Sequence, residues 1–216
     1  MKKFALIPLC VLSLSAAFAV GCKKPVNYLD YISEMRYGIW LYSSDGLEVK
    51  IYRSSKETPY IADGIKSEMC DLTEVYVTLP KTYDEVELSI GSAGGEMNWQ
   101  AVDNCYYISF ADEVSGDNVE VNLTCGKDSY SCTAVSVLYG GVMDCNGAVK
   151  CVIEHDAELF KSMTENGIFC GEIYARLLYD EGCYYYVGVC GRDKNISAYL
   201  VDGERGKIIA TKKITA

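Results

Sequence analysis

Hydrophobic and polar residues alternate over much of the chain in short runs, which is the pattern of β-strands with one buried face. Leu47, Val49 and Ile51 alternate with polar residues, and the preceding segment 43–46 ends in the Asp-Gly pair that favours tight hairpin turns. Similar runs recur up to residue 138, separated by Gly, Pro and Asn. They predict an antiparallel β-sandwich-like module over residues 28–138, with strands at 36–42, 47–53, 72–79, 85–90, 96–101, 106–110, 119–125 and 132–138.

The pattern changes after the Tyr-Gly-Gly segment at 139–141. Apolar residues from Val149 to Met163 recur at spacings of three and four, which predicts a helix with one buried face. Asn146 is the expected N-cap, and the Asn-Gly pair at 166–167 is the expected C-cap. The pattern therefore predicts a small α+β module over residues 139–216, in which one helix packs on an antiparallel meander. The strands of the meander are expected at 169–179, 183–190, 196–201 and 207–214. The chain as a whole is predicted to be mainly β.

The first residues have the order of an export signal. Lys2 and Lys3 precede an apolar run from Phe4 to Val20, which has 17 residues and contains Pro8. A spanning helix prefers about 20 apolar residues, so this run is interpreted as a cleaved signal peptide over residues 1–21.

The end of that run resembles the lipobox of bacterial lipoproteins. Ala19-Val20-Gly21-Cys22 places a small residue before a cysteine, which in that family becomes the lipidated amino terminus. The resemblance implies lipidation at Cys22, a lipidated leash over residues 22–27, and attachment to the extracytoplasmic face of the cell membrane. Ala17-Phe18-Ala19 also fits a conventional cleavage site, so a secreted form is the alternative.

Charge and composition exclude several classes of function. The chain has 30 acidic and 20 basic residues, a net charge of -10, and so acidic a surface repels nucleic acid. His155 is the single histidine, which excludes a His-based triad and a multi-His metal site. Half of the residues are apolar, enough to build a folded core.

The cysteines form no metal or redox motif. Setting aside Cys10 and Cys22, the remaining cysteines contain no C-x-x-C pair, and several lie within apolar strand patterns, as Cys125, Cys183 and Cys190 do. Buried thiols that act as small hydrophobic residues are one interpretation, and one or more disulfides are the other. We predict no metal and no cofactor.

A search for catalytic motifs gives no candidate catalytic residue: the chain contains no G-x-S-x-G, H-E-x-x-H or P-loop pattern. Three acidic residues lie near Gly116 in the sequence, namely Asp112, Glu113 and Asp117. A calcium site is one interpretation of this cluster, and a solvated turn is the other. Tyrosine is abundant, with 18 residues. In the run at 184–186, the first and third tyrosines are predicted to share one strand face and the second to take the other. An exposed stripe of this kind can stack on sugars or on proteins, or it can simply stabilise strands.

The segment from Tyr184 to Ile214 resembles the terminal hairpin of PepSY-like and related small α+β extracytoplasmic modules. It shares with them a strand, a polar turn, a strand that ends in Asp202-Gly203, and a last strand opened by Gly206-Lys207. The whole chain resembles uncharacterised surface lipoproteins of Gram-positive bacteria. These resemblances imply a location in the cell envelope and supply no catalytic residue. The chain departs from the PepSY pattern because it shows one helix-plus-meander unit.

Together these features predict a membrane-tethered extracytoplasmic lipoprotein that acts as a non-catalytic binding or interaction module. Its expected partners are the membrane, through the lipid anchor, and an envelope protein or polysaccharide, with the oligomeric state left open. Two alternatives remain. One is an inhibitor or regulator of an exported protease or signalling protein, and the other is a carboxylate-dependent carbohydrate-active enzyme, which needs two converging carboxyl groups.

Overall fold

The computed structural model describes residues 25–61 and 63–215. Strands make up 55% of the structure and helices 11%, which confirms the mainly β prediction. The helices are the 3-10 helix η1 (Tyr28–Tyr31), α1 (Cys145–His155) and α2 (Ala157–Ser162). The strands are β1 (Ile32–Ser44), β2 (Leu47–Glu57), β3 (Met69–Thr78), β4 (Glu87–Ile90), β5 (Ala93–Glu96), β6 (Asn98–Gln100), β7 (Cys105–Phe110), β8 (Asn118–Cys125), β9 (Asp128–Ser136), β10 (Thr164–Glu165), β11 (Ile168–Phe169), β12 (Gly171–Tyr179), β13 (Cys183–Gly191), β14 (Ile196–Asp202) and β15 (Ile208–Ile214).

The strands up to β9 form one curled antiparallel sheet, which is nearly closed. Its strands run in the order β5, β4, β8, β9, β1, β2, β3, β7 and β6, and β5 comes back into contact with β7. The inside of the curl is filled by one apolar cluster that includes Val49, Ile51, Val75 and Val77. The predicted turn at Asp45-Gly46 is confirmed, because both residues have positive φ and join β1 to β2.

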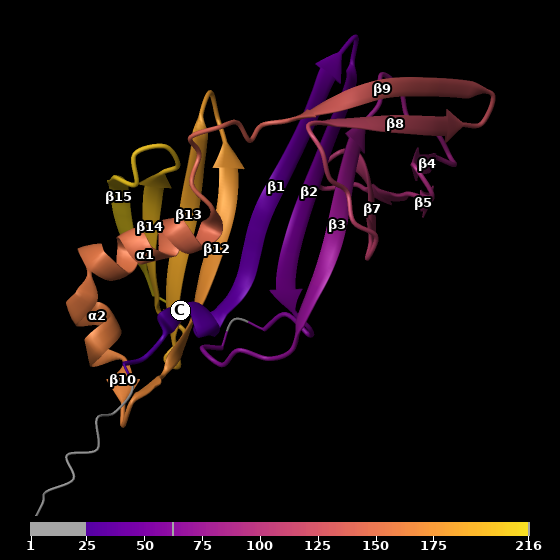
Figure 1. Ribbon diagram of the computed structural model, residues 1–216. Helices are drawn as coiled ribbons and strands as arrows, with labels where there is room; N and C mark the ends of the chain where they lie inside the picture. The colour runs from indigo at the N-terminus through magenta and orange to yellow at the C-terminus, as the bar shows by residue number, and fades with distance from the viewer. Residues whose placement is uncertain (1–24, 62, 216) are drawn as a thin grey trace, which may run out of the picture.

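Strand β1 belongs to both halves of the molecule (Figure 1). Its first residues pair in parallel with β12, and Trp40 and Leu41 pair antiparallel with β9. A bulge between Arg36 and Gly38 separates the two stretches. The large sheet therefore has 13 strands and continues through β12, β13 and β14 to β15. The division at residue 139 stays a prediction, because the two halves have separate apolar clusters but share this strand.

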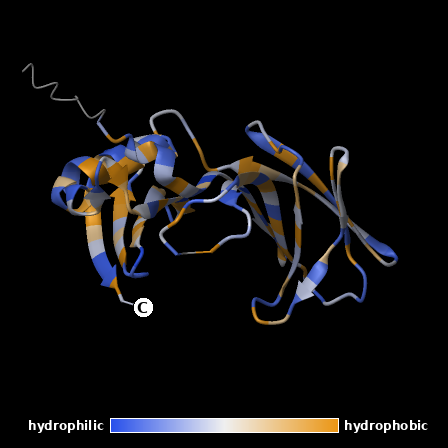
Figure 2. Cartoon of the chain, turned by 90° about the horizontal axis from the view of Figure 1, so that it is seen from below, coloured by the Kyte–Doolittle hydropathy of each residue, from blue (hydrophilic) through white to orange (hydrophobic). Residues whose placement is uncertain are grey.

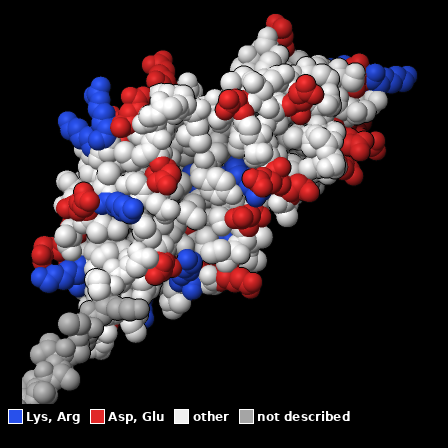
Figure 3. Space-filling model, viewed as in Figure 1, with Lys and Arg blue, Asp and Glu red and all other residues white. Residues whose placement is uncertain are grey.

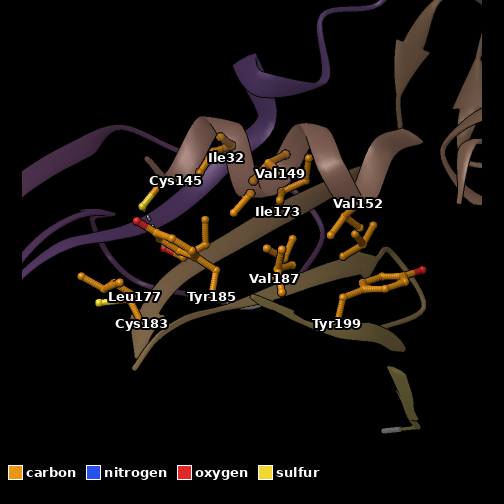
Figure 4. Close-up of a cluster of buried hydrophobic side chains, with 14 of the residues drawn as sticks. Ile32, Cys145, Val149, Val152, Ile173, Leu177, Cys183, Tyr185, Val187 and Tyr199 are labelled. Carbon is orange, nitrogen blue, oxygen red and sulfur yellow. Dashed lines mark hydrogen bonds between the residues drawn. The ribbon is translucent and has the colours of Figure 1, made fainter. Parts of the chain in front are cut away.

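Helix α1 lies across one face of strands β12 to β15, and α2 follows it beside β10 (Figure 1). Many segments of this half are hydrophobic (Figure 2), and its buried apolar residues form one cluster. This second cluster joins Val149 and Val152 of α1 to Ile173, Tyr185 and other buried residues of the strands (Figure 4). The meander with one helical layer thus forms as the apolar spacing from Val149 onward predicts.

Both predicted helix caps are wrong. Asp144 is the N-cap, and its side chain accepts a hydrogen bond from Gly147 N at 2.7 Å. The helix also breaks at Asp156, which ends α1 and caps α2 by accepting from Leu159 N. Asn166 and Gly167, both with positive φ, form the tight turn between β10 and β11 instead of a C-cap. The apolar spacing continues through the break, which is why it suggests a single helix.

Candidate functional site

The candidate residues chosen from the sequence do not converge on a catalytic centre. Cys22 lies outside the described residues. His155 is exposed at the end of α1, with its ring 6.2 Å from that of Tyr199. Asp112, Glu113 and Asp117 are exposed, and residues 25–61 and 63–215 contain no group of three metal-ligating side chains.

Three tyrosines from neighbouring strands form a continuous aromatic surface. Tyr52 of β2, Tyr76 of β3 and Tyr107 of β7 are half-buried. The ring centroids of Tyr52 and Tyr76 are 5.7 Å apart, and those of Tyr76 and Tyr107 are 4.9 Å apart. The Arg36 guanidinium lies 4.3 Å from the Tyr52 centroid, within cation–π distance. We call Tyr52, Tyr76 and Tyr107 the tyrosine band.

A charged group borders the band on the same strands. Glu74 accepts a hydrogen bond from Tyr107 Oη at 3.2 Å and another from Lys56 Nζ at 3.2 Å. Burial, with the Glu74 carboxylate beside it, raises the pKa of Tyr76. Burial likewise raises the pKa of Tyr107. Both phenols therefore stay protonated at neutral pH; Tyr107 donates its hydrogen bond to Glu74, and the Tyr76 hydroxyl is the one that can donate to a ligand.

A groove of about 390 Å³ runs over the part of the band formed by Tyr52 and Tyr76. Tyr52 and Tyr76 contribute aromatic surface to it, while Glu48, Lys50 and Asp103 supply charged groups. An aromatic surface bordered by hydrogen-bonding groups suits a ligand that has both apolar faces and hydroxyl groups.

A second polar cluster joins the two halves of the sheet. The Arg176 guanidinium donates to both carboxylate oxygens of Glu34, from Nε at 2.7 Å and from Nη2 at 2.5 Å, and also to Tyr60 Oη at 3.0 Å. Burial alone would lower the pKa of Arg176, but the hydrogen bonds to Glu34 outweigh it and the pKa is raised. Glu34 is also in register with Lys56 across β1 and β2, so charges of alternating sign run from β12 toward the tyrosine band.

Glu172 lies beneath the segment that joins β2 to β3. Its side chain is fully buried, and its Oε1 accepts from Gly64 N at 2.9 Å and from Tyr174 Oη at 2.6 Å. Its Oε2 has no hydrogen-bond partner in the described part of the chain. Burial, followed by hydrogen bonds with Cys190 and Glu172, raises the pKa of Tyr174. These contacts hold the Gly64 backbone against the sheet.

Two acidic side chains meet on another surface. Glu87 and Glu96 are directly opposite each other on β4 and β5, and both are exposed. Residues opposite each other in an antiparallel pair place their Cβ atoms about 5 Å apart. Together with Glu85 they line a groove of about 410 Å³. This is one place among the described residues where carboxylates lie together in a groove, as the alternative enzymatic function would require.

The cysteines of the described residues are all free thiols, and five of them are buried: Cys105, Cys125, Cys145, Cys183 and Cys190. Cys145 donates from Sγ to Arg36 O at 3.2 Å, where α1 meets β1. Burial raises the pKa of its thiol from 9.0 to about 12. The buried cysteines therefore pack as small hydrophobic residues.

Stability is expected to fall in alkaline solution partly because of Cys145. The thiol ionises near pH 9.0 in the unfolded chain but only near pH 12 in the folded one. Its contribution is therefore complete below pH 9 and is lost as the pH rises toward 12. Urea unfolding between about pH 8 and pH 10.5, under reducing conditions, should show this loss. Cys145→Ala should make the fall shallower, whereas the exposed Cys70→Ala should leave it unchanged. Equal slopes in all three proteins would contradict the assignment.

The tyrosine run that stands out in the sequence lies on β13, whereas the tyrosine band lies on β2, β3 and β7. The predicted alternation at 184–186 is confirmed: Tyr185 is buried in the apolar cluster between α1 and the sheet, while Tyr184 and Tyr186 are half-buried. The tyrosine band instead takes one residue from each of three strands. Tyr107 follows the buried Tyr106 on β7. The available signal was strand alternation, which places Tyr52 and Tyr76 on the face opposite Ile51 and Val75.

No family model, curated protein or solved structure matches the chain. No helix within residues 25–61 and 63–215 is both long enough and apolar enough to cross a membrane. The binding role therefore rests on the geometry and charge of the described residues.

Proposed function

We propose that the protein is an exported, lipid-anchored binding protein that uses the tyrosine band to bind a polysaccharide of the cell envelope. Residues 1–21 act as the signal peptide and Cys22 as the lipid attachment site in this proposal. The observation that carries the binding role is the groove lined by Tyr52 and Tyr76, whose ring centroids lie 5.7 Å apart, with the Tyr107 ring beside Tyr76 at 4.9 Å.

The surroundings of the band favour a carbohydrate as the ligand. Sugar rings present apolar C–H faces that stack on aromatic rings, and hydroxyl groups that accept and donate hydrogen bonds. Tyr52 and Tyr76 supply the aromatic surface, while Glu48, Lys50 and Asp103 supply charged groups for the hydroxyls. The remaining surface is acidic, with basic side chains scattered among the acidic ones on the face seen in Figure 3, so a neutral ligand meets no general repulsion.

Removing the central ring should weaken binding about two- to tenfold, since aromatic contacts contribute roughly 0.5–1.5 kcal/mol each. Tyr76→Val is the chosen variant because valine keeps the preference for β structure. Calorimetric titration with a soluble cell-wall polysaccharide fraction measures the effect. Tyr179→Ala is the matched control, because Tyr179 is an exposed tyrosine at the end of β12, outside the band.

Unchanged affinity in Tyr76→Val, with Tyr179→Ala as the weaker binder, would overturn the assignment of the band. The same samples are analysed for released sugar. Binding without release supports the binding role, whereas turnover would favour the second candidate, a carboxylate-dependent enzyme that uses Glu87 and Glu96, which face the acidic groove.

A further inference from the structure

We propose that the end of the molecule formed by α2 and the β10–β11 hairpin contacts the lipid surface, with Ile168 at the level of the lipid headgroups. This inference rests on the proposed lipid anchor at Cys22. It assigns an interaction surface to the protein and a direction in which the tyrosine band is displayed.

The start of the described chain is fixed to this end of the molecule. The Tyr28 ring packs against Phe160 of α2 at 4.9 Å and against Phe169 of β11 at 5.3 Å. Its hydroxyl lies 3.3 Å from Thr164 Oγ1, and Tyr31 Oη accepts from Phe169 N at 3.3 Å. Helix η1 is thus tied to α2 and the hairpin, and the indigo start of the described chain lies beside β10 in Figure 1.

Covalent geometry then limits how far the anchor can be from this end. Three residue steps separate Cys22 from Pro25, the first described residue, and one step spans at most about 3.6 Å. An acylated Cys22 therefore lies within roughly 11 Å of Pro25 in any conformation. So short a link brings whichever surface surrounds residues 25–28 close to the lipid headgroups.

That surface carries an exposed apolar side chain. Ile168 is 58% exposed and follows the tight turn at Asn166 and Gly167, so the hairpin presents it to solvent. Isoleucine in this position gains from burial at a lipid interface. The nearby charges are Lys161, Glu158 and Glu165, which are not predominantly basic. Contact therefore depends on the acyl anchor and on Ile168 rather than on anionic lipid.

This orientation directs the tyrosine band away from the membrane. In Figure 1 the indigo start of the chain, α2 and β10 lie at one end of an elongated molecule, and β8, β9 and β4 lie at the other. The strands of the band, β2, β3 and β7, line the apolar cluster of that second half, while the Tyr52 side chain also packs against the cluster of the helical half. A polysaccharide beyond the membrane would reach the band without obstruction from the lipid.

Quenching by brominated lipids tests the orientation. The lipidated full-length protein, purified from membranes, is reconstituted in phosphatidylcholine vesicles with brominated acyl chains. The variant Ile168→Trp adds a tryptophan at the hairpin, while the native Trp40 and Trp99 lie in the curled sheet and provide the baseline. Val135→Trp is the matched control, since Val135 is 51% exposed on β9, where this strand pairs with β1 in the curled sheet, outside the end formed by α2 and the hairpin. We expect the added emission of Ile168→Trp to be quenched and that of Val135→Trp to be unaffected.

Equal quenching of the two variants, or quenching of Val135→Trp alone, would overturn the orientation. Intact mass of the same samples separates this result from a failure of the anchor. A chain that begins at Cys22 and carries a diacylglyceryl group, with no quenching at position 168, refutes the orientation alone. A chain without lipid refutes the anchor, and the orientation falls with it.

Discussion

Replacing Tyr185 by alanine is expected to lower the free energy of unfolding by about 3–5 kcal/mol. Tyr185 is 1% exposed and is one of the largest fully buried side chains among the described residues. Its ring lies between the sheet and α1, next to Cys145 (Figure 4), and its hydroxyl donates to Met143 O at 2.7 Å. Alanine removes the ring and leaves both a cavity and a carbonyl group without its donor.

Two variants separate these causes in urea denaturation. Tyr185→Phe keeps the ring and removes only the hydrogen bond, so it should cost about 1 kcal/mol. Tyr184→Ala changes the preceding residue, which is half-buried on the opposite face of β13, and should cost less than about 1.5 kcal/mol. A larger loss in Tyr184→Ala than in Tyr185→Ala would mean that the strand faces are assigned the wrong way round.

Features set by neighbouring residues could be predicted from the sequence. The turn at Asp45-Gly46 depends on two residues that tolerate positive φ, and the alternation in β2 depends on three apolar side chains two positions apart. The amphipathic spacing after Val149 likewise indicates a helix. In each case the residues that determine the structure are close neighbours in the sequence. A local pattern is therefore sufficient to predict it.

Features that need distant partners could not be predicted. Nothing in the first residues of β1 indicates that they pair in parallel with β12, more than 130 residues later, because alternation specifies a face and not a partner. The tyrosine band has the same origin: Tyr52, Tyr76 and Tyr107 lie on three separate strands and meet only through the register of β2, β3 and β7. The helix break at Asp156 escaped prediction because its carboxylate is also the acceptor for the distant Tyr199 hydroxyl, at 2.7 Å.

The parallel contact between β1 and β12 makes a second large effect testable. Glu34, which is 7% exposed, forms a bidentate ion pair with Arg176 across these strands. Glu34→Ala leaves a largely buried guanidinium whose partners among the described residues are Tyr60 Oη and the faces of Tyr174 and Tyr186. Breaking a buried pair costs about 3–5 kcal/mol, and water reaching the Arg176 side chain, 34% exposed, reduces the expected loss to roughly 2–4 kcal/mol.

The double variant Glu34→Ala/Arg176→Met decides whether the loss comes from the stranded charge. Because it removes both ions, it should recover more than half of the stability lost in Glu34→Ala. Lys50→Ala breaks an exposed pair with Glu48 and should change the free energy of unfolding by less than about 0.5 kcal/mol. Hydrogen exchange should show faster opening of residues 32–36 in Glu34→Ala, since these amides lie where β1 meets β12. If the double variant were no more stable than Glu34→Ala, the pair would act through packing, and the charge of Arg176 would not be what holds the two halves of the sheet together.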